Sequence, residues 1–434
     1  MTHFLQRIGR RRPQVRLEPW QRNLYTIVGA QLTAVMGFGI SIPFLPFYIQ
    51  QLGITETAQV AFWVGLINSA SPVVMALASP IWGLLADRYG RKPMLVRAQV
   101  GGGMMLFLMA LVMNVPQLAG LRILQGAISG SVAAATTLVA STVPRERCGY
   151  SMGLLQSAIF LGHSLGPFAG GIVGATLGYR VTFMISGVLL LVSGFLVALL
   201  VHEEFVRPSR RRQAENGFSS TLRLLTGQPV VLTALVLLML NNLSVNVTTP
   251  VLPLYVQTLV PTDSEASAAT GLIVGATALM NAVGAIVVGR SADRLGQRRV
   301  LLTCMSIGAL IYFPQMLTRN PTQLLLLRAI MGFAMGGVTP TANSLIAEGT
   351  PEGRQGGVYG ISASFNAAGR ALGPVLGAVV VTHWGTARVF PVTGTLLSLV
   401  VFIVFLGTRS LRPAQAGRPS TPAEPDCSDR QPKG

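Results

Sequence analysis

Ionisable side chains are rare inside the long apolar stretches of this chain, and Arg122 is one of them. It lies in the run LRILQG, and Gly126 and Gly130 follow it at intervals of four residues. On a helix these three positions share one face, where glycine lets a neighbouring helix approach. A buried arginine is costly and needs a partner. The pattern therefore favours charge handling inside a membrane over an arginine that snorkels to the interface.

Proton transfer needs a group that titrates, and the apolar stretches offer few. His163 lies in one of them, and an unperturbed imidazole titrates at about pH 6.5. None of the 15 acidic residues lies deep in such a stretch, and Asp87 and Glu348 come nearest. His163 and Glu348 are therefore candidates for proton coupling. A lone membrane histidine is also a common hydrogen-bond residue between helices, and facilitated diffusion without protons stays open.

Catalysis and cofactor chemistry find no support in the sequence. No nucleophile–histidine–acid set and no GxxxxGK(S/T) nucleotide loop occurs. The three cysteines, Cys148, Cys304 and Cys427, are not spaced for a metal. We predict a protein that is not an enzyme and that holds no cofactor or metal.

The composition places these residues in a membrane. Only 11% of the 434 residues are charged, against roughly 25% in soluble domains. The mean hydropathy is +0.55. A helix that spans a bilayer needs about 20 apolar residues. Twelve stretches reach that length, at 24–50, 60–86, 94–113, 117–143, 150–177, 181–201, 230–257, 267–289, 300–318, 322–347, 357–382 and 388–408.

The charge distribution predicts which side of the membrane the loops face. The net charge of +18 comes from short basic clusters between the apolar stretches, which is typical of cytoplasmic loops. No continuous basic face indicates nucleic acid. The loops at 51–59 and 114–116 carry no Lys or Arg. We therefore expect a multi-pass protein of the plasma membrane with both termini in the cytoplasm.

One long polar segment, 202–229, divides the twelve stretches six and six. We assign residues 1–22 to a basic cytoplasmic N-terminus, 23–201 to a first six-helix bundle, 202–229 to a cytoplasmic linker and 230–410 to a second bundle. Residues 411–434 are polar and rich in Pro and Ser, so we expect a disordered cytoplasmic tail there.

The two halves repeat each other at a nearly constant offset. IPFLPFY at 42–48 recurs as TPVLPLY at 249–255, 207 residues later, and Arg122 recurs as Arg328, 206 residues later. A register held over several segments indicates duplication of a six-helix unit. We expect an all-α membrane fold of two pseudo-symmetric bundles, related by an axis along the membrane normal, with a cavity between them. Rocking the bundles would open that cavity to one side and then to the other.

The loop between the second and third stretches carries a specific pattern. It reads GLLADRYGRKPML over 83–95, and a tight turn is expected at Gly90. The loop resembles the signature of the major facilitator superfamily. GRSADRLGQRRVL at 289–301 resembles that signature more weakly, because Gln297 stands where Arg91 does. The resemblance covers about residues 20–410 and implies the fold expected above.

The resemblance also implies a cytoplasmic latch that holds the outward-open state. Asp87 would meet the start of the eleventh stretch near Val358 and Tyr359, and Asp293 would meet the start of the fifth. The latch residues would be Gly83, Asp87, Arg88, Gly90, Arg91, Lys92, Asp293, Arg294 and Gly296.

The fifth stretch contains GHSLGPFAGG over 162–171. Glycines at intervals of four make a groove for tight helix packing. The run resembles the motif that marks antiporters within the superfamily, and it implies a seal against leak. Ordinary packing of small residues is the alternative. The residues of the motif are Gly162, Gly166, Pro167, Gly170 and Gly171.

The runs FLPFYIQQLG and ASPIWGLLADRYGRKPMLVRA are similar to those of twelve-span drug:proton antiporters of bacterial multidrug efflux. This resemblance implies an amphipathic substrate and protons as partners, with a proton gradient as the energy source and antibiotic resistance as a consequence. The run around Arg122 resembles the proton-linked arginine motif of the superfamily, which makes Arg122 a further candidate for proton coupling. The resemblance also implies a monomer in the lipid bilayer. Arg370 interrupts the second copy of the glycine motif and would favour an anionic or zwitterionic substrate. Candidates for the cavity lining are Gln31, Met36, Gln125, Gln156, Asn241, Asn242, Asn246, Met331, Met335, Asn366 and Arg370.

Two other interpretations stay open. The same fold could export one sugar, metabolite or lipid-linked compound, or the protein could be a membrane sensor that does not transport. The two latch loops and the glycine motif favour moving halves over a static scaffold.

Overall fold

Helix starts and ends follow from asparagine and glycine residues at repeated positions. Asn114 and Asn320 cap α5 (Val115–Ile128) and α15 (Pro321–Gly336), because each side-chain oxygen accepts a backbone N–H of the first turn. Gly90 and Gly296, at φ +98° and +90°, follow α3 (Thr57–Tyr89) and α13 (Asp263–Leu295) in tight turns. The turn predicted at Gly90 is confirmed.

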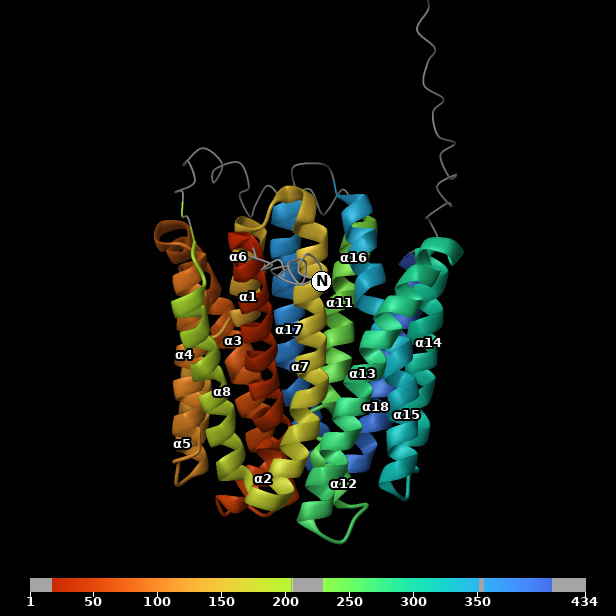
Figure 1. Cartoon of the computed structure of the whole chain (residues 1–434). Coiled ribbons are helices and arrows are strands. Elements are labelled where there is room, and N and C mark those ends of the chain that lie inside the picture. The colour runs from red at the N-terminus through yellow and green to blue at the C-terminus, as the bar shows by residue number, and fades with distance from the viewer. Residues whose placement is uncertain (1–17, 204, 206–228, 351–354, 408–434) are drawn as a thin grey trace, which may run out of the picture.

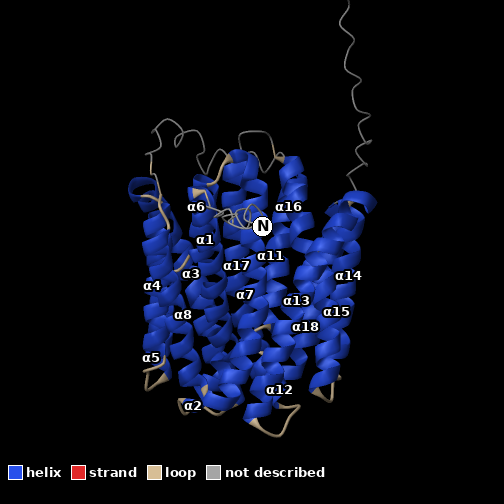
Figure 2. Cartoon of the chain, in the orientation of Figure 1, coloured by secondary structure: helices blue, strands red, loops and turns tan. Residues whose placement is uncertain are grey.

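The computed structural model describes residues 18–203, 205, 229–350 and 355–407, and these residues contain no strand. Their helices stand side by side along one direction (Figure 1), and Figure 2 shows short connections between them. The first half comprises α1 (Pro19–Ser41), η2 (Ile42–Phe44), α2 (Leu45–Gln51), α3, α4 (Arg91–Met109), α5, α6 (Ser131–Thr142), η3 (Arg145–Arg147), α7 (Cys148–Leu177) and α8 (Tyr179–Leu200). The second half comprises α11 (Pro229–Thr248), α12 (Leu252–Gln257), α13, α14 (Gln297–Gln315), α15, α16 (Val338–Gly349), α17 (Gln355–Trp384), η4 (Thr386–Arg388) and α18 (Val389–Gly407).

Each expected stretch coincides with one helix or with consecutive helical segments. The fourth is interrupted at Ser129 and Gly130, where Gly130 has φ +122°, and the first is interrupted at the prolines of 42–48. Ten helical stretches of the described residues are long and apolar enough to cross a bilayer. α4 and α14 are not among them, since basic residues in their first turns lower their hydropathy. The all-helical fold is confirmed, and the count of twelve crossings stays a prediction.

The duplication seen in the sequence recurs as matched contacts in the structure. The Tyr48 hydroxyl donates to a carbonyl at the end of α4 at 2.8 Å, and the Tyr255 hydroxyl donates to one at the end of α14 at 3.1 Å. The ring of Tyr48 lies 4.9 Å from that of Phe183, and the ring of Tyr255 lies 4.7 Å from that of Phe390. In both halves, therefore, the same two contacts join the first apolar stretch to the third and to the sixth.

The two halves meet at one end of the molecule. We call the end with the α3–α4 turn at Gly90 the upper end, as drawn in Figure 1, and the end with the α7–α8 turn at Gly178 the lower end. The halves pack through α3 on α17 and through α7 on α13. All buried residues of α3 lie between Val60 and Ser69, in its lower half. Because the upper half of α3 buries no residue, the halves separate toward the upper end.

Candidate functional site

The lower end is closed by a crossing of α7 and α13 in which glycine lies against glycine. A Cβ on Gly171 would lie 2.9 Å from the Gly271 Cα and 2.8 Å from the Ser267 carbonyl oxygen. Side chains do not approach this closely, so glycine is the residue that fits. Across the same boundary the Ser164 hydroxyl donates to the Gly275 carbonyl at 3.0 Å. We call this crossing, together with that of α3 and α17, the lower gate.

The crossing of α3 and α17 completes the lower gate. A Cβ on Gly65 would lie 2.6 Å from the Ala378 Cβ and 2.8 Å from the Pro374 carbonyl oxygen. Beside this crossing, the side-chain amides of Gln50 and Gln257 donate to each other at 3.1 and 3.2 Å. These two glutamines are 207 residues apart and occupy matched positions in the repeat. The contacts described here between the two halves therefore join neutral groups, and Gln257 also donates to the Asp263 carboxylate within its own half at 2.6 Å.

The residues of the 162–171 motif on α7 face two different neighbouring helices. The glycines at intervals of four face α1, namely Gly162, Gly166 and Gly170. A Cβ on Gly166 would lie 2.7 Å from the Met36 carbonyl oxygen. Gly171 and the Pro167 carbonyl face α13 instead. The motif thus joins α7 both to its own half and to the opposite half, and its role as a seal stays a prediction.

His163 and Arg370 occupy matched positions of the repeat, 207 residues apart, and both side chains are exposed. His163 lies between Gly162, which faces α1, and Ser164, which faces α13. Its side chain therefore points between these two helices, just above the lower gate. Arg370 follows Gly369, which faces α11, and precedes the contact of α17 with α3. Both positions lie just above the lower gate, one in each half. We call these two positions, with the polar residues next to them, the apex.

The apex contains further polar groups on α11 and α17. The Asn242 amide donates to the Asn366 amide oxygen at 2.6 Å, one helical turn from Arg370. Asn246 donates to the Asn242 carbonyl at 2.8 Å. The guanidinium of Arg370 has no hydrogen-bond or carboxylate partner within the described ranges. The structure therefore leaves a cation with free donors beside a pair of amides.

Arg122 is buried, and two amides hold its guanidinium. It donates to the side-chain oxygen of Gln125 and, at 3.4 Å, to that of Asn68 on α3. Gly126 contacts α3 as well, because a Cβ there would lie 2.5 Å from the Ser71 carbonyl oxygen. Among the described residues the partners of Arg122 are thus neutral, and the bond to Asn68 ties α5 to α3.

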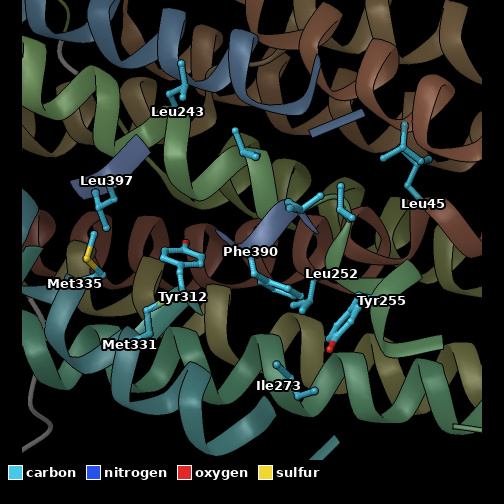
Figure 3. Close-up of a cluster of buried hydrophobic side chains, with 14 of the residues drawn as sticks. Leu45, Leu243, Leu252, Tyr255, Ile273, Tyr312, Met331, Met335, Phe390 and Leu397 are labelled. Atoms are coloured by element: carbon cyan, nitrogen blue, oxygen red, sulfur yellow. The ribbon is translucent and has the colours of Figure 1, made fainter. Parts of the chain in front are cut away.

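Arg328, which matches Arg122 in the second half, has different surroundings. The guanidinium carbon of Arg328 lies 5.9 Å from the ring centre of Tyr312 and 5.6 Å from that of Phe390. Its Nε and Nη2 have no hydrogen-bond partner in the described part of the chain. Met331 stands where Gln125 stands in the first half, and it lies near Tyr312 in the buried cluster of Figure 3. Aromatic faces therefore replace amides around this arginine.

The other cavity candidates differ in burial. Four more are buried, namely Gln31, Asn241, Met331 and Met335. Both methionines pack in the apolar core of the second half (Figure 3), so in this conformation they fill the core and do not line an open space. Met36 is half-buried, and Gln156 is exposed.

The α3–α4 turn at the upper end is bound by Glu203, a residue outside the expected latch. The Glu203 carboxylate accepts the backbone N–H of Arg91 at 2.9 and 3.0 Å and that of Lys92 at 2.7 Å. α4 is preceded by Gly90, which has no side chain to cap the helix. Glu203 therefore supplies an acceptor and a negative charge at the positive end of α4.

Asp87 lies near this carboxylate. Together with Arg91 and Glu203 it lines a pocket of about 660 Å³ at the upper end. The guanidinium of Arg88 lies 5.3 Å from the ring centre of Tyr89. The side chains of Tyr359, Asp293 and Glu348 lie outside the described residues. The latch contacts and the coupling role of Glu348 therefore stay predictions.

Known proteins are similar to this chain in sequence and in fold. A profile of the Major Facilitator Superfamily matches residues 27–262 and 260–428. The chain is 32% identical over 405 residues to the multidrug resistance protein MdtG of Klebsiella pneumoniae (strain 342), which covers 92% of this chain and 96% of that protein. A bacterial homolog of the human lysosomal transporter Spinster, inward-facing and unoccupied, has a TM-score of 0.74 at 14% identity, covering 91% of this chain and 98% of that one. A D-xylose-proton symporter has a TM-score of 0.69 at 16% identity, covering 88% and 97%. The chain belongs to the major facilitator superfamily.

Proposed function

We propose that this protein is a secondary transporter that exports amphipathic drugs across a bacterial plasma membrane in exchange for protons. The lower gate is the observation that carries the proposal. Two bundles that touch at one end and part toward the other expose the space between them to one side, as alternating access requires. The identity of 32% to a multidrug resistance protein over nearly the whole chain supports drugs as the cargo.

The upper end faces the cytoplasm in this proposal. The helix ends on that side carry Arg91, Lys92 and Arg294, and basic residues are retained on the cytoplasmic side. In this orientation the lower gate closes the outer side of the membrane. The conformation described here is then inward-open and ready to take up substrate from the cytoplasm or the inner leaflet.

The apex is the proposed substrate site. It lies directly above the closed gate, where a bound molecule contacts both halves. Arg370 offers free donors, and Asn242 and Asn366 offer amide groups to a polar head. His163 is the proposed proton carrier, because every described carboxylate lies at a helix end or in a connection. Substrate and proton would then occupy sites at matched positions of the two halves.

Flux measurements on the purified protein in liposomes test this proposal. The probes are permanently charged and neutral dyes of several chemical classes, so that passive trapping by pH does not mimic transport. Accumulation of several classes under an imposed pH gradient, absent from protein-free liposomes, supports the proposal. Transport of one compound class alone favours a narrow exporter. A folded protein that moves no dye under the gradient contradicts the proposal and favours a sensor.

A further inference from the structure

A groove with apolar walls lies between α3, α4 and α5 near the upper end. Its volume is about 680 Å³. Its lining residues include Trp82, Lys92, Val96, Arg97, Val100 and Met104. Five of these are on α4, where Lys92 and Met104 are about 18 Å apart along the helix axis. The two cations line the upper part of the groove, and apolar side chains continue below them.

Arg97 carries hydrogen-bond donors that the described residues do not use. Its guanidinium stacks on the indole of Trp82, with the guanidinium carbon 3.5 Å from the ring centre. Nη2 donates to the Ser129 carbonyl at 3.4 Å. Nε and Nη1 are buried and have no hydrogen-bond partner in the described part of the chain. Buried donors without an acceptor cost free energy, so an acceptor bound in this groove would be favoured.

The positive charge of the groove is not neutralised by the described residues. Neither Lys92 nor Arg97 forms an ion pair with a described carboxylate. The Glu203 carboxylate lies near Lys92, but its oxygens accept the backbone N–H groups of Arg91 and Lys92 and not the side-chain ammonium. An anion that enters the groove therefore meets two cations without a competing carboxylate in the lining.

We propose that this groove binds an anionic phospholipid of the surrounding bilayer. The phosphate accepts hydrogen bonds from Arg97 and lies near the Lys92 ammonium, and one acyl chain lies against Val96, Val100 and Met104. This arrangement matches the order of groups in a lipid, with charge at the membrane surface and hydrocarbon below it. The inference rests on the membrane location and orientation of the proposed function, and it is independent of the transported drug.

The bound lipid would connect three helices. Arg97 contacts Trp82 of α3 and the carbonyl of Ser129, which lies in the break between α5 and α6. The upper half of α3 buries no residue against the rest of the protein. A lipid seated in this groove therefore lies against Trp82, on a gate helix whose upper half the protein leaves largely exposed.

The test measures lipid contact with Trp82 in the full chain without drug or gradient. Trp20, Trp63 and Trp384 are replaced by Phe, and the protein is placed in nanodiscs that contain brominated phosphatidylglycerol or brominated phosphatidylcholine. Bromine quenches a nearby indole. We expect stronger quenching by phosphatidylglycerol at equal mole fraction. Equal quenching by the two lipids overturns the proposal and leaves the transport hypothesis untouched.

Variants of the groove give a second measure. Arg97→Gln should weaken the phosphatidylglycerol preference by roughly tenfold, because charge-assisted hydrogen bonds are lost. Arg97→Lys should retain part of it. Arg290→Gln removes one exposed positive charge from α13 in the other half and should leave the preference unchanged. An unchanged preference in folded Arg97→Gln protein also overturns the proposal, and the wild-type comparison decides if that variant does not fold.

Discussion

Gly171 and Gly271 touch backbone to backbone across the boundary between the two halves. A Cβ on Gly171 would lie 2.9 Å from the Cα of Gly271, and a Cβ on Gly271 would lie 2.8 Å from the Cα of Gly171. A single methyl group at either position must push α7 and α13 apart. The closed state of the lower gate therefore depends on the absence of side chains at these two positions.

Gly171→Ala should open the lower gate, because its methyl group would also lie 2.8 Å from the Ser267 carbonyl oxygen. Spin labels at the exposed positions Leu177 and Glu265 report the separation of α7 and α13 at the lower end. We expect a longer distance distribution in the variant. Gly153→Ala on the same helix is the matched control, since no heavy atom other than the helix's own backbone lies within 4 Å of its Cβ. Identical distributions in wild type and Gly171→Ala would rule out steric closure.

Glu203→Ala should destabilise the first turn of α4. The backbone N–H groups of Arg91 and Lys92 lose their acceptor, which typically costs about 1–2 kcal/mol for a helix cap. We expect a lower midpoint of thermal unfolding and faster hydrogen exchange at these two amides. Glu146→Ala removes an exposed carboxylate elsewhere at the upper end and serves as the control. If both variants exchange alike at Arg91, Glu203 is not a cap.

Arg122→Ala should abolish export under a pH gradient while the protein still inserts into the membrane. The substitution removes the bond to Gln125 on the same helix and the bond to Asn68 that ties α5 to α3. Arg328→Met should cost less transport activity, because an apolar side chain suits the aromatic surroundings of that position. Dye flux in liposomes compares the two variants. Wild-type flux in Arg122→Ala would remove this residue from the mechanism.

Arg370→Gln should shift substrate preference. Loss of the free guanidinium removes a charge-assisted contact, so transport of acidic amphiphiles should fall roughly tenfold. Transport of cationic and neutral dyes should stay within about twofold, since they gain nothing from this cation. Arg388→Gln at the lower end is the control for a general change in surface charge. A uniform decrease for all dyes would show that Arg370 does not select the substrate.

Local patterns predict most of the helices, because apolar length, asparagine caps and glycine turns depend only on residues that are close in the sequence. The repeat is equally visible, and its matched tyrosines make matched contacts in both halves. The break of the fourth stretch at Gly130 is not predicted. The four-residue spacing places Gly130 on the same helix face as Gly126, and no local feature distinguishes a glycine that packs from one that adopts positive φ.

Long-range partners are harder to predict than helices. Glu203 binds Arg91 across 112 positions of the chain, and in the sequence it is one of two adjacent glutamates. A helix that begins after Gly90 needs an acceptor from elsewhere, and that need is the signal that could have pointed to such a carboxylate. The methionines on α15 illustrate the opposite case. Met331 and Met335 have the composition of a soft binding pocket, but they pack into the core.

The lower gate joins neutral side chains and bare backbone, and dissolved ions screen contacts between charges only. Screening by salt should therefore weaken these contacts little, so closure of this gate should depend less on ionic strength than closure through ion pairs would. The Glu203 carboxylate, which caps α4 at the opposite end, is charged, so its contact is sensitive to ionic strength. The two ends of the protein therefore respond differently to salt.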